Sequence, residues 1–380
     1  MDLTSYQFLE KIRHDLHAHP ELSGEEYETG QKVASILSGY RPALLLEKIG
    51  GTGVIAVFDS GNPGPSVLFR SELDALPIQE INDFAHRSNR ENISHKCGHD
   101  GHTTILIGLA KKLSEGMLLK GKVILLFQPA EENGSGAETV MSDPAFRSIH
   151  PDYVFAFHNL PGYPFKQIVI KQNAFTASVK SIIIRLQGKT THAAEPENGI
   201  NPALAIARII TETAKLSNNT PEQEDFSVVT PIHINMGEVA YGTAAGNGEV
   251  HLTLRTWTEP HMKRLETKII AVIEQVSERE QLKAEISWTN KFTANENDDE
   301  ATEMVMAAAL KNNFSVTKRD FPFKWGEDFG LFTQHFKGAM FGIGAGVNTP
   351  ALHNPDYDFP DELIPVGIQM FYSIAQKILD

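Results

Sequence analysis

The stretch Val123-Ile-Leu-Leu-Phe-Gln-Pro-Ala-Glu131-Glu132 decides the fold class of this chain. Its apolar residues follow one another without alternation, which is typical of a strand that is buried on both faces. Strands of this kind need helices on both sides, so the pattern predicts an α/β fold with a mixed, largely parallel sheet. Similar apolar runs, bounded by Gly and Pro, recur at Gly53–Phe58, Val67–Phe69, Tyr153–Phe157 and Ala339–Ile343.

Helical periodicity predicts the helices that cover this sheet. Leu9, Ile12 and Leu16 fall at helical spacing near the N-terminus, behind Thr4 or Ser5 as the capping residue. The same periodicity predicts further helices over Glu26–Leu37, Thr103–Leu113 and Glu300–Asn312, and from about Asp361 to Leu379.

The pattern changes in the middle of the chain, and we expect a separate α+β domain there. The predicted order is strand, helix, strand, strand, helix, strand, which is the ferredoxin-like βαββαβ arrangement. We therefore expect a first domain over residues 1–176 and 291–380, interrupted by an inserted domain over 177–290. The inserted elements are Val179–Gln187, Asn201–Leu216, Phe226–Met236, Glu249–Trp257, His261–Glu278 and Lys283–Thr289.

One strand of the inserted domain alternates cleanly between apolar and polar residues. Val250, Leu252 and Leu254 would face one side of the sheet and His251, Thr253 and Arg255 the other. Such alternation predicts a sheet with one face covered by helices and one face open.

The bulk composition excludes several kinds of partner. A net charge of -14 at pH 7 argues against nucleic acid and against anionic membranes, because both need a basic protein surface. No apolar run reaches the length of a membrane-spanning helix, and the first residues do not resemble a signal peptide. The single cysteine cannot form an internal disulfide, so a cytoplasmic location is the default expectation.

Cys97 and His99 are candidate metal ligands just before the predicted Thr103 helix. In an extended chain, residues two apart point to the same side, so both could reach one ion. A thiolate ligand favours softer ions such as Zn, although Mn, Co and Ni remain open. The alternative is a buried structural cysteine beside a capping histidine.

Glu131 and Glu132 are a second candidate group. Two acids at the end of a buried strand are costly unless something compensates their charge. Neighbouring residues of an extended segment point apart, so one carboxylate could bind metal while the other acts as general base. The alternative is a solvated helix start, where acids suit the helix dipole.

Three further residues follow core strands. His158 ends the Tyr153 strand, and His353 comes shortly after the Ala339 strand. Each alone would be interpreted as a structural histidine, and their shared position favours ligation. Asp74, after the Val67 strand, could orient a ligand histidine from behind, or it could simply form a turn before Pro77.

Two further patterns resemble functional sites, but we do not interpret them as such. His14, His17 and His19 resemble a metal cluster, but His14 and His17 fall on the polar side of the first helix, which predicts a surface position. Gly342-Ile-Gly-Ala-Gly resembles a dinucleotide loop but runs to Pro350 instead of into a helix.

The chain resembles the amidohydrolase branch of the aminoacylase/carboxypeptidase-type dinuclear metallopeptidases, nearly from end to end. That branch includes hippurate hydrolases, N-acetyl-diaminopimelate deacetylases and auxin-conjugate hydrolases. The motifs that carry the resemblance are Arg13-His-Asp-Leu-His-Ala-His-Pro-Glu-Leu, Leu73-Asp-Ala-Leu-Pro-Ile, His95-Lys-Cys-Gly-His-Asp-Gly-His, Gln128-Pro-Ala-Glu-Glu, Gly188-Lys-Thr-Thr-His-Ala-Ala, Leu254-Arg-Thr, Gly326-Glu-Asp-Phe and Leu352-His-Asn-Pro.

The resemblance implies hydrolysis of N-acyl-amino acids, with two divalent metal ions (Zn, Mn, Co or Ni) and a homodimer formed through the inserted domain as a lid. Glu131 would be the general base, His192 would stabilise the oxyanion, and Arg255 would pair with the substrate carboxylate. The metal ligands implied by the resemblance are Cys97, His99, Glu132, His158 and His353.

The chain departs from the family pattern at positions that face substrate or lie in the lid. Glu72 stands where the family usually has Asp, and Thr190 and Thr191 replace glycines before His192. Trp325-Gly-Glu-Asp lacks the common Ser after Gly, and Ala244-Ala-Gly-Asn-Gly-Glu lacks the usual Asn-x-Ile-Pro. The metal and base positions are intact, so the departures bear on acyl-group preference and dimer geometry.

Three other functions stay open on the sequence alone. A dipeptidase or exopeptidase could use the same scaffold, and a non-catalytic relative could keep the metal ligands without the chemistry. A nucleotide-dependent oxidoreductase is suggested only by the α/β pattern and the Gly342 loop.

Overall fold

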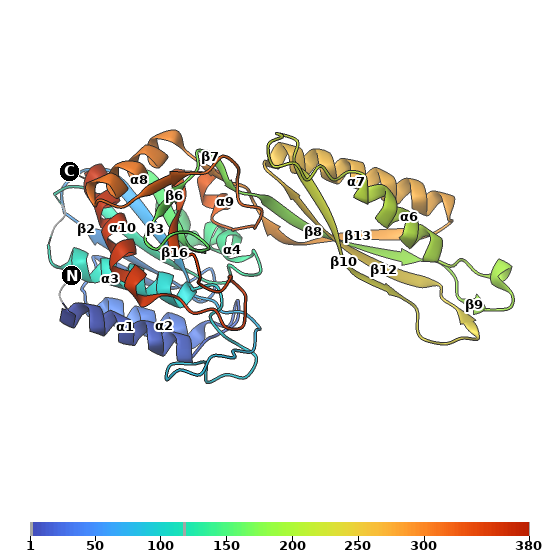
Figure 1. Cartoon of the computed structure of the whole chain (residues 1–380), viewed down its shortest axis with the longest axis horizontal. Helices are drawn as coiled ribbons and strands as arrows, with labels where there is room; N and C mark the ends of the chain where they lie inside the picture. The colour runs from blue at the N-terminus through green and yellow to red at the C-terminus, as the bar shows by residue number, and fades with distance from the viewer. Residues whose placement is uncertain (1–2, 117–118, 380) are drawn as a thin grey trace. The chain divides into compact units, whose positions relative to one another are not determined.

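A computed structural model of the chain describes residues 3–116 and 119–379. The chain divides into two compact units (Figure 1). The first unit takes in the chain up to Phe175, then Asn295–Asp320 and Glu327–Asp380, and the second unit takes in Thr176–Ala294 and Phe321–Gly326. The sequence does not predict that Phe321–Gly326 belongs to the second unit, where the backbone N of Ala177 donates to the carbonyl oxygens of Phe323 and Trp325.

A single mixed sheet forms the centre of the first unit. Its strands β4, β3, β5 and β16 run parallel to one another in that order, whereas β1–β2, β2–β4 and β16–β6 pair antiparallel. The predicted mixed, largely parallel α/β class is therefore confirmed. The strands in spatial order are β1 (Leu44–Ile49), β2 (Gly53–Asp59), β4 (Lys122–Gln128), β3 (Ser66–Glu72), β5 (Tyr153–Pro161), β16 (Lys337–Gly346), β6 (Ile168–Ile170) and β15 (Val316–Lys318).

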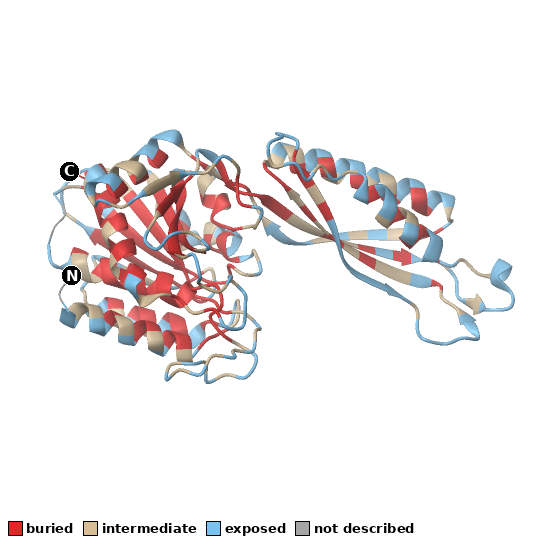
Figure 2. Cartoon of the chain, viewed as in Figure 1, coloured by how far each residue is buried: buried red, intermediate tan, exposed pale blue. Residues whose placement is uncertain are grey.

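The central strands of this sheet are buried along most of their length (Figure 2). In β4, Val123, Leu125 and Phe127 join one core, while Ile124 and Leu126 are equally buried but do not belong to it. The helices of that core are α1 (Leu3–Ala18), α2 (Tyr27–Ser38), α3 (His99–Ser114), α8 (Asp299–Lys311) and α10 (Ile364–Leu379). The shorter elements of this unit are α4 (Gly136–Ser142), α5 (Pro144–Arg147), α9 (Gly330–Thr333), β7 (Asn173–Thr176), β14 (Asn295–Asn297) and the 3-10 turn Asp361–Leu363.

The four parallel strands bring their carboxyl ends to one edge of the sheet. Open α/β sheets bind ligands at this edge, because the loops that leave the strands converge there. The chain places Asp74 just after β3, Glu131 just after β4 and His158 within the last residues of β5. The segment that follows β16 carries His353.

The second unit is an antiparallel sheet with strand order β10-β12-β8-β13 and two long helices. Val250, Leu252 and Leu254 pack into its core, whereas the alternate residues of β12 remain partly exposed, which confirms the predicted alternation. The elements are β8 (Ser178–Gln187), β9 (Thr191–His192), the 3-10 turn Pro196–Asn198, α6 (Ala203–Ala214), β10 (Ser227–Met236), β11 (Thr243–Ala244), β12 (Asn247–Thr256), α7 (Glu259–Arg279) and β13 (Lys283–Phe292).

Within residues 3–116 and 119–379, no helix has both the length and the apolar character that spanning a bilayer requires.

The prediction that His17 lies at the surface is wrong. Its side chain is fully buried, with Nδ1 2.8 Å from Asp100 Oδ2 and Nε2 3.1 Å from Glu80 Oε1. The polar side of α1 is covered by segments distant in sequence, so helical periodicity alone could not place it. His14 and His19 keep partly exposed side chains.

This burial predicts a pH-dependent stability. Burial opposes protonation of His17, but the hydrogen bond and charge of Asp100, with Glu80, outweigh it and raise the pKa of His17 to about 9. A raised histidine pKa stabilises the fold fully below pH ~6.5, and that stabilisation is lost as pH rises through the folded pKa. We expect the free energy of unfolding to fall between pH 6.5 and 9.5, by roughly 3 kcal/mol at most.

Urea unfolding across this pH range measures the effect, with His17→Gln as the comparison. The substitution should flatten the dependence. A wild-type stability that does not fall above pH 7 would contradict the proposed burial of a charged His17.

Candidate metal centre

The structure brings the predicted ligands of the first unit together at the carboxyl edge of its sheet. Three ligand atoms, from Cys97, His99 and His158, lie within 4.8 Å of one another, and so do those of Cys97, Glu132 and His353. Cys97 belongs to both groups, which we call the His158 cluster and the His353 cluster. Imidazole, thiolate and carboxylate are the ligand types that bind Zn and its neighbours in the first transition row.

A sharp turn at Gly98, not an extended chain, directs Cys97 and His99 to one place. Gly98 has a φ of 92°, and a Cβ there would lie 2.8 Å from Asn159 Oδ1, so only glycine fits. The helix begins at His99 instead of Thr103. Cys97 Sγ lies 3.5 Å from His158 Nε2 as a result.

Asp74 orients His99. The Nδ1 atom of His99 lies 3.0 Å from the Asp74 carbonyl oxygen and 3.2 Å from its Oδ1. Asp74 Oδ2 in turn accepts hydrogen bonds from Ser23 Oγ at 2.7 Å and from the Glu132 backbone N at 2.9 Å. Burial opposes ionisation of Asp74, but these hydrogen bonds outweigh it and lower its pKa.

The orientation leaves Nε2 of His99 buried without a hydrogen-bond partner. This atom lies 3.8 Å from Glu132 Oε1 and 4.0 Å from Glu131 Oε2. Although burial opposes its charge, Asp74, Glu72 and Glu132 raise the pKa of His99 to about 10. A histidine fixed through Nδ1 with Nε2 directed at carboxylates has the geometry of a metal ligand.

Glu131 and Glu132 lie in a turn, so the expectation of an extended segment is wrong. The preceding Ala130 has a φ of 53°, which curls the chain and brings both carboxylates near His99. Burial, followed by the charges of Glu327 and Glu132, raises the pKa of Glu131 well above its usual range. Burial also raises the pKa of Glu132 to about 7.

The two remaining histidines differ in environment. His158 is buried and its Nδ1 lies 2.9 Å from the Asn159 carbonyl oxygen, while burial lowers its pKa and keeps it neutral. His353 lies in a loop with a φ of 66°, and its side chain is 51% exposed. Its Nε2 nevertheless lies 3.6 Å from Glu132 Oε2.

A buried guanidinium beneath the site was missed in the sequence analysis. Arg70 Nε donates to Gln128 Oε1 at 2.9 Å, and Nη2 donates to Glu327 Oε1 at 2.9 Å and Asp328 Oδ1 at 2.5 Å. Arg70 also pairs with Glu72. A charged residue inside the otherwise apolar strand β3 was the signal that could have revealed it.

Glu72, which departs from the family pattern, connects this network to α3. Its Oε2 lies 2.7 Å from His102 Nδ1, and His102 Nε2 lies 2.6 Å from Asn159 Oδ1. Both ring nitrogens of His102 are therefore engaged, so His102 supports the structure around the candidate ligand histidines.

The balance of charge fits divalent cations. Among the described residues, the guanidinium of Arg70 pairs with Glu72, Glu327 and Asp328. The nearby carboxylates of Asp74, Glu131 and Glu132 have no guanidinium partner among those residues. Burial and neighbouring acids also raise the pKa of the Cys97 thiol. Three carboxylates gathered around the single imidazole of His99 are costly to bury, and cations would offset that cost. The carboxylates concerned are Glu72, Asp74, Glu131, Glu132, Glu327 and Asp328.

His192 and Arg255 belong to the second unit. His192 is exposed on β9, and its Nδ1 accepts a hydrogen bond from Ala194 N at 3.0 Å. Arg255 lies on the open face of β12 and donates from Nη1 to the Lys324 carbonyl oxygen at 2.7 Å. Their predicted roles stay predictions.

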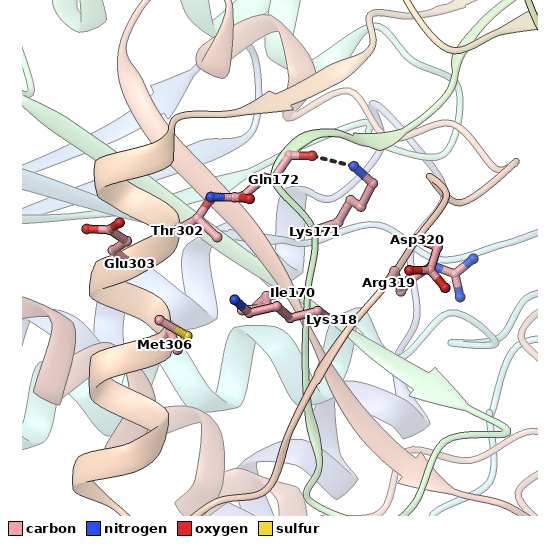
Figure 3. A pocket seen from close by; sticks show the side chains of 9 residues that line it. All are labelled: Ile170, Lys171, Gln172, Thr302, Glu303, Met306, Lys318, Arg319 and Asp320. Atoms are coloured by element: carbon pink, nitrogen blue, oxygen red, sulfur yellow. Dashed lines mark hydrogen bonds between the residues drawn. The ribbon is translucent and has the colours of Figure 1, made fainter. Parts of the chain in front are cut away.

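A separate cavity of about 280 Å³ in the first unit contains none of the predicted site residues (Figure 3). It is lined by residues of β6, β15, α8 and their flanks, and it holds no histidine or cysteine. The lining residues are Ile170, Lys171, Gln172, Thr302, Glu303, Met306, Lys318, Arg319 and Asp320.

The fold and the two clusters define a metal-binding α/β protein with buried carboxylates beside its ligands. The model of peptidase family M20/M25/M40 matches residues 68–377. The chain therefore belongs to this family, and the predictions of the family and of a metal-dependent amidohydrolase are confirmed.

Relatives cover nearly the whole chain. A hippurate hydrolase of Campylobacter jejuni is 32% identical over 375 residues, which span 97% of this chain and 96% of that one. An N-acetyl-L-cysteine deacetylase of Bacillus subtilis is 32% identical over 376 residues, which span 97% of this chain and 88% of that one. The crystal structure of a Bacillus subtilis protein described as a dinuclear metal-binding peptidase has a TM-score of 0.85 at 29% identity, covering 100% of this chain and 99% of that one.

Cys97→Ala tests the shared ligand. We expect bound divalent metal per chain to fall to half or less, because both clusters lose the same ligand atom. Elemental analysis of gel-filtered protein measures this, with Ser71→Ala, a buried substitution on β3, as the control for packing. Unchanged metal content in folded Cys97→Ala protein would remove Cys97 from the ligands.

Proposed function

We propose that this chain hydrolyses the amide bond of N-acyl-amino acids at a centre of two divalent metal ions. The observation that carries the proposal is the shared Cys97, which belongs to two adjacent ligand clusters beside the buried Glu131. The names of the relatives support the substrate class, since both act on acylated amino acids.

His99 and His158 would hold one ion with Cys97, and Glu132 and His353 would hold the other. When bound, such ions supply a Lewis acid and give water a pKa of roughly 7, so that it loses a proton near neutrality. The thiolate ligand favours Zn, while Mn, Co and Ni are compatible with the imidazole and carboxylate ligands. Binding would also favour the thiolate form of Cys97 over its buried thiol.

Glu131 would act as the general base. Its carboxylate is buried beside the ligands without accepting a hydrogen bond from Arg70, so it is available to a water molecule. A pKa raised by burial makes this carboxylate a stronger base than one in water. It would take the proton of the attacking water and pass it to the amine nitrogen as the carbon–nitrogen bond breaks.

The two residues of the second unit would bind substrate. Because Nδ1 of His192 accepts a hydrogen bond, its ring proton resides on Nε2, which can donate to an oxyanion. Arg255 has a planar guanidinium on an open sheet face, which suits bidentate pairing with the substrate carboxylate.

Free-amine release tests the function. The substrates are N-acetyl-, N-benzoyl- and indolylacyl-amino acids with dipeptides alongside, each with Zn, Mn or Co supplied. We expect chelator-sensitive release from acyl-amino acids. Faster release from dipeptides would favour an exopeptidase on the same scaffold, and no release from folded, metal-loaded protein would favour a non-catalytic relative.

Glu131→Gln tests whether Glu131 is the general base and not a metal ligand. We expect it to keep its metal and to lose turnover by roughly 10²–10⁴-fold, the usual contribution of a general base. Glu138→Gln on the exposed side of α4 is the matched control and should retain wild-type turnover. Normal hydrolysis by Glu131→Gln would refute the assignment.

We also propose that the protein is located in the cytoplasm.

We further propose a homodimer formed through the edge strand β10. β10 lies at the edge of its sheet, where backbone groups are unpaired and can join a second copy. Ile232, Ile234 and Met236 on this strand are 60%, 50% and 40% exposed, and Val239 and Tyr241 follow at 90% and 96%. An exposed apolar edge of this kind marks an association surface.

Ile234→Lys should convert the dimer to a monomer, because a charge at the paired edge opposes strand association. Light scattering after size exclusion measures the mass. Leu204→Lys on α6, whose native side chain is 62% exposed, is the matched control and should stay dimeric. A dimer that survives Ile234→Lys would place the interface elsewhere.

A further inference from the structure

His353 is the candidate ligand with the least support from its own packing. Its side chain is 51% exposed, and its backbone is held in the left-handed region at a φ of 66°. A histidine must keep a fixed position to bind a metal tightly. Contacts elsewhere in its loop must therefore hold it near Glu132.

Lys96 supplies the first of these contacts. It is fully buried, and its carbonyl oxygen accepts a 2.8 Å hydrogen bond from the His353 backbone N. Its ammonium donates to the Tyr357 carbonyl oxygen at 2.7 Å and to Glu80 Oε1 at 2.5 Å. Lys96 thus binds both ends of the segment 353–357 while its neighbour Cys97 belongs to both clusters.

Arg13 supplies the second set of contacts, further along the same loop. It is fully buried on α1 and donates from Nη1 to Asp358 Oδ1 at 2.6 Å and from Nε to Asp361 Oδ1 at 2.6 Å. Nη1 also lies 3.3 Å from Asp100 Oδ2, directly after the ligand His99. One guanidinium therefore links the segment after His353 to the segment after His99.

Buried ion pairs contribute little net stability, because desolvation offsets most of the attraction. Their effect lies in fixing one geometry, since breaking a single pair leaves an uncompensated charge. Here the fixed geometry is that of the loop 353–361, in which residues 353–356 are exposed whereas Tyr357 and Phe359 are buried.

We propose that Lys96 and Arg13 form a buried cationic clamp that positions the loop 353–361, so that His353 reaches the ion of the His353 cluster. Both are positioning residues, because neither belongs to the ligand clusters. The inference rests on the proposed metal centre. It predicts that weakening the clamp loosens one ion and leaves the ion of the His158 cluster in place.

Asp358→Asn weakens the clamp without removing a buried cation, since the side chain of Asp358 is 28% exposed. Asp356→Asn is the matched control in the same loop, since the exposed Asp356 makes no side-chain hydrogen bond or ion pair with the residues that the structure describes. Transfer of zinc from the loaded protein to a chromophoric chelator gives a rate for each ion. We expect Asp358→Asn to release one ion roughly tenfold faster than Asp356→Asn, a loss typical of support around ligands.

The second ion should leave at the wild-type rate, and excess zinc should restore turnover. A role in fold stability alone would instead speed the release of both ions together, or lower the melting temperature without a change in either rate. Equal release from Asp358→Asn and Asp356→Asn would overturn the clamp.

Lys96→Met is a stronger test, and His353→Ala is the benchmark for complete loss of that ion. Folded Lys96→Met protein should lose the same ion as His353→Ala, and retention of both ions would refute the role of Lys96. If Lys96→Met does not fold, Asp358→Asn decides the question. Wild-type protein that binds no metal would refute the proposed function itself, which distinguishes that failure from failure of the clamp.

Discussion

The site depends on the crowding of buried carboxylates around one guanidinium and one imidazole. Arg70 pairs with Glu72, Glu327 and Asp328, while Asp74, Glu131 and Glu132 crowd the adjacent side of His99 without a guanidinium of their own. Such an arrangement is costly in a protein interior unless further positive charge enters. The pKa values of Glu131, Glu132 and the Cys97 thiol are raised because burial and neighbouring acids disfavour their charged forms. Divalent cations would relieve that cost, and this connects the electrostatics of the site to its proposed chemistry.

The sheet explains why these groups meet. Strands β3, β4, β5 and β16 run parallel, so the residues that follow them converge although they are far apart in sequence. Helix α3 adds His99 at its first turn, and the buried pair of Lys96 and Arg13 holds the loop after β16. A rigid scaffold thus supports a site assembled from loops, as is usual for α/β enzymes.

Much of this arrangement could be predicted from residue types and spacing. Glu131, Glu132 and His158 stood out because they follow apolar strands, and Cys97 and His99 because they lie two residues apart just before a predicted helix. The local geometry could not be predicted, because it depends on the left-handed Gly98 and Ala130 and on which loops cover α1. His17 and Arg70 were misjudged or missed for the same reason, since burial of a charged residue is decided by distant segments. The roles of His192 and Arg255 stay predictions that rest on the family resemblance, since no local pattern specifies them.

Calorimetric titration of metal-stripped protein with zinc tests the central claim most directly, provided that ions bound and protons released are both counted. We predict two ions per chain, with protons released because Glu131, His99 and the Cys97 thiol hold protons in the metal-free chain. Binding of one ion or none, or binding without proton release, would contradict a dinuclear centre built on these carboxylates and this thiol.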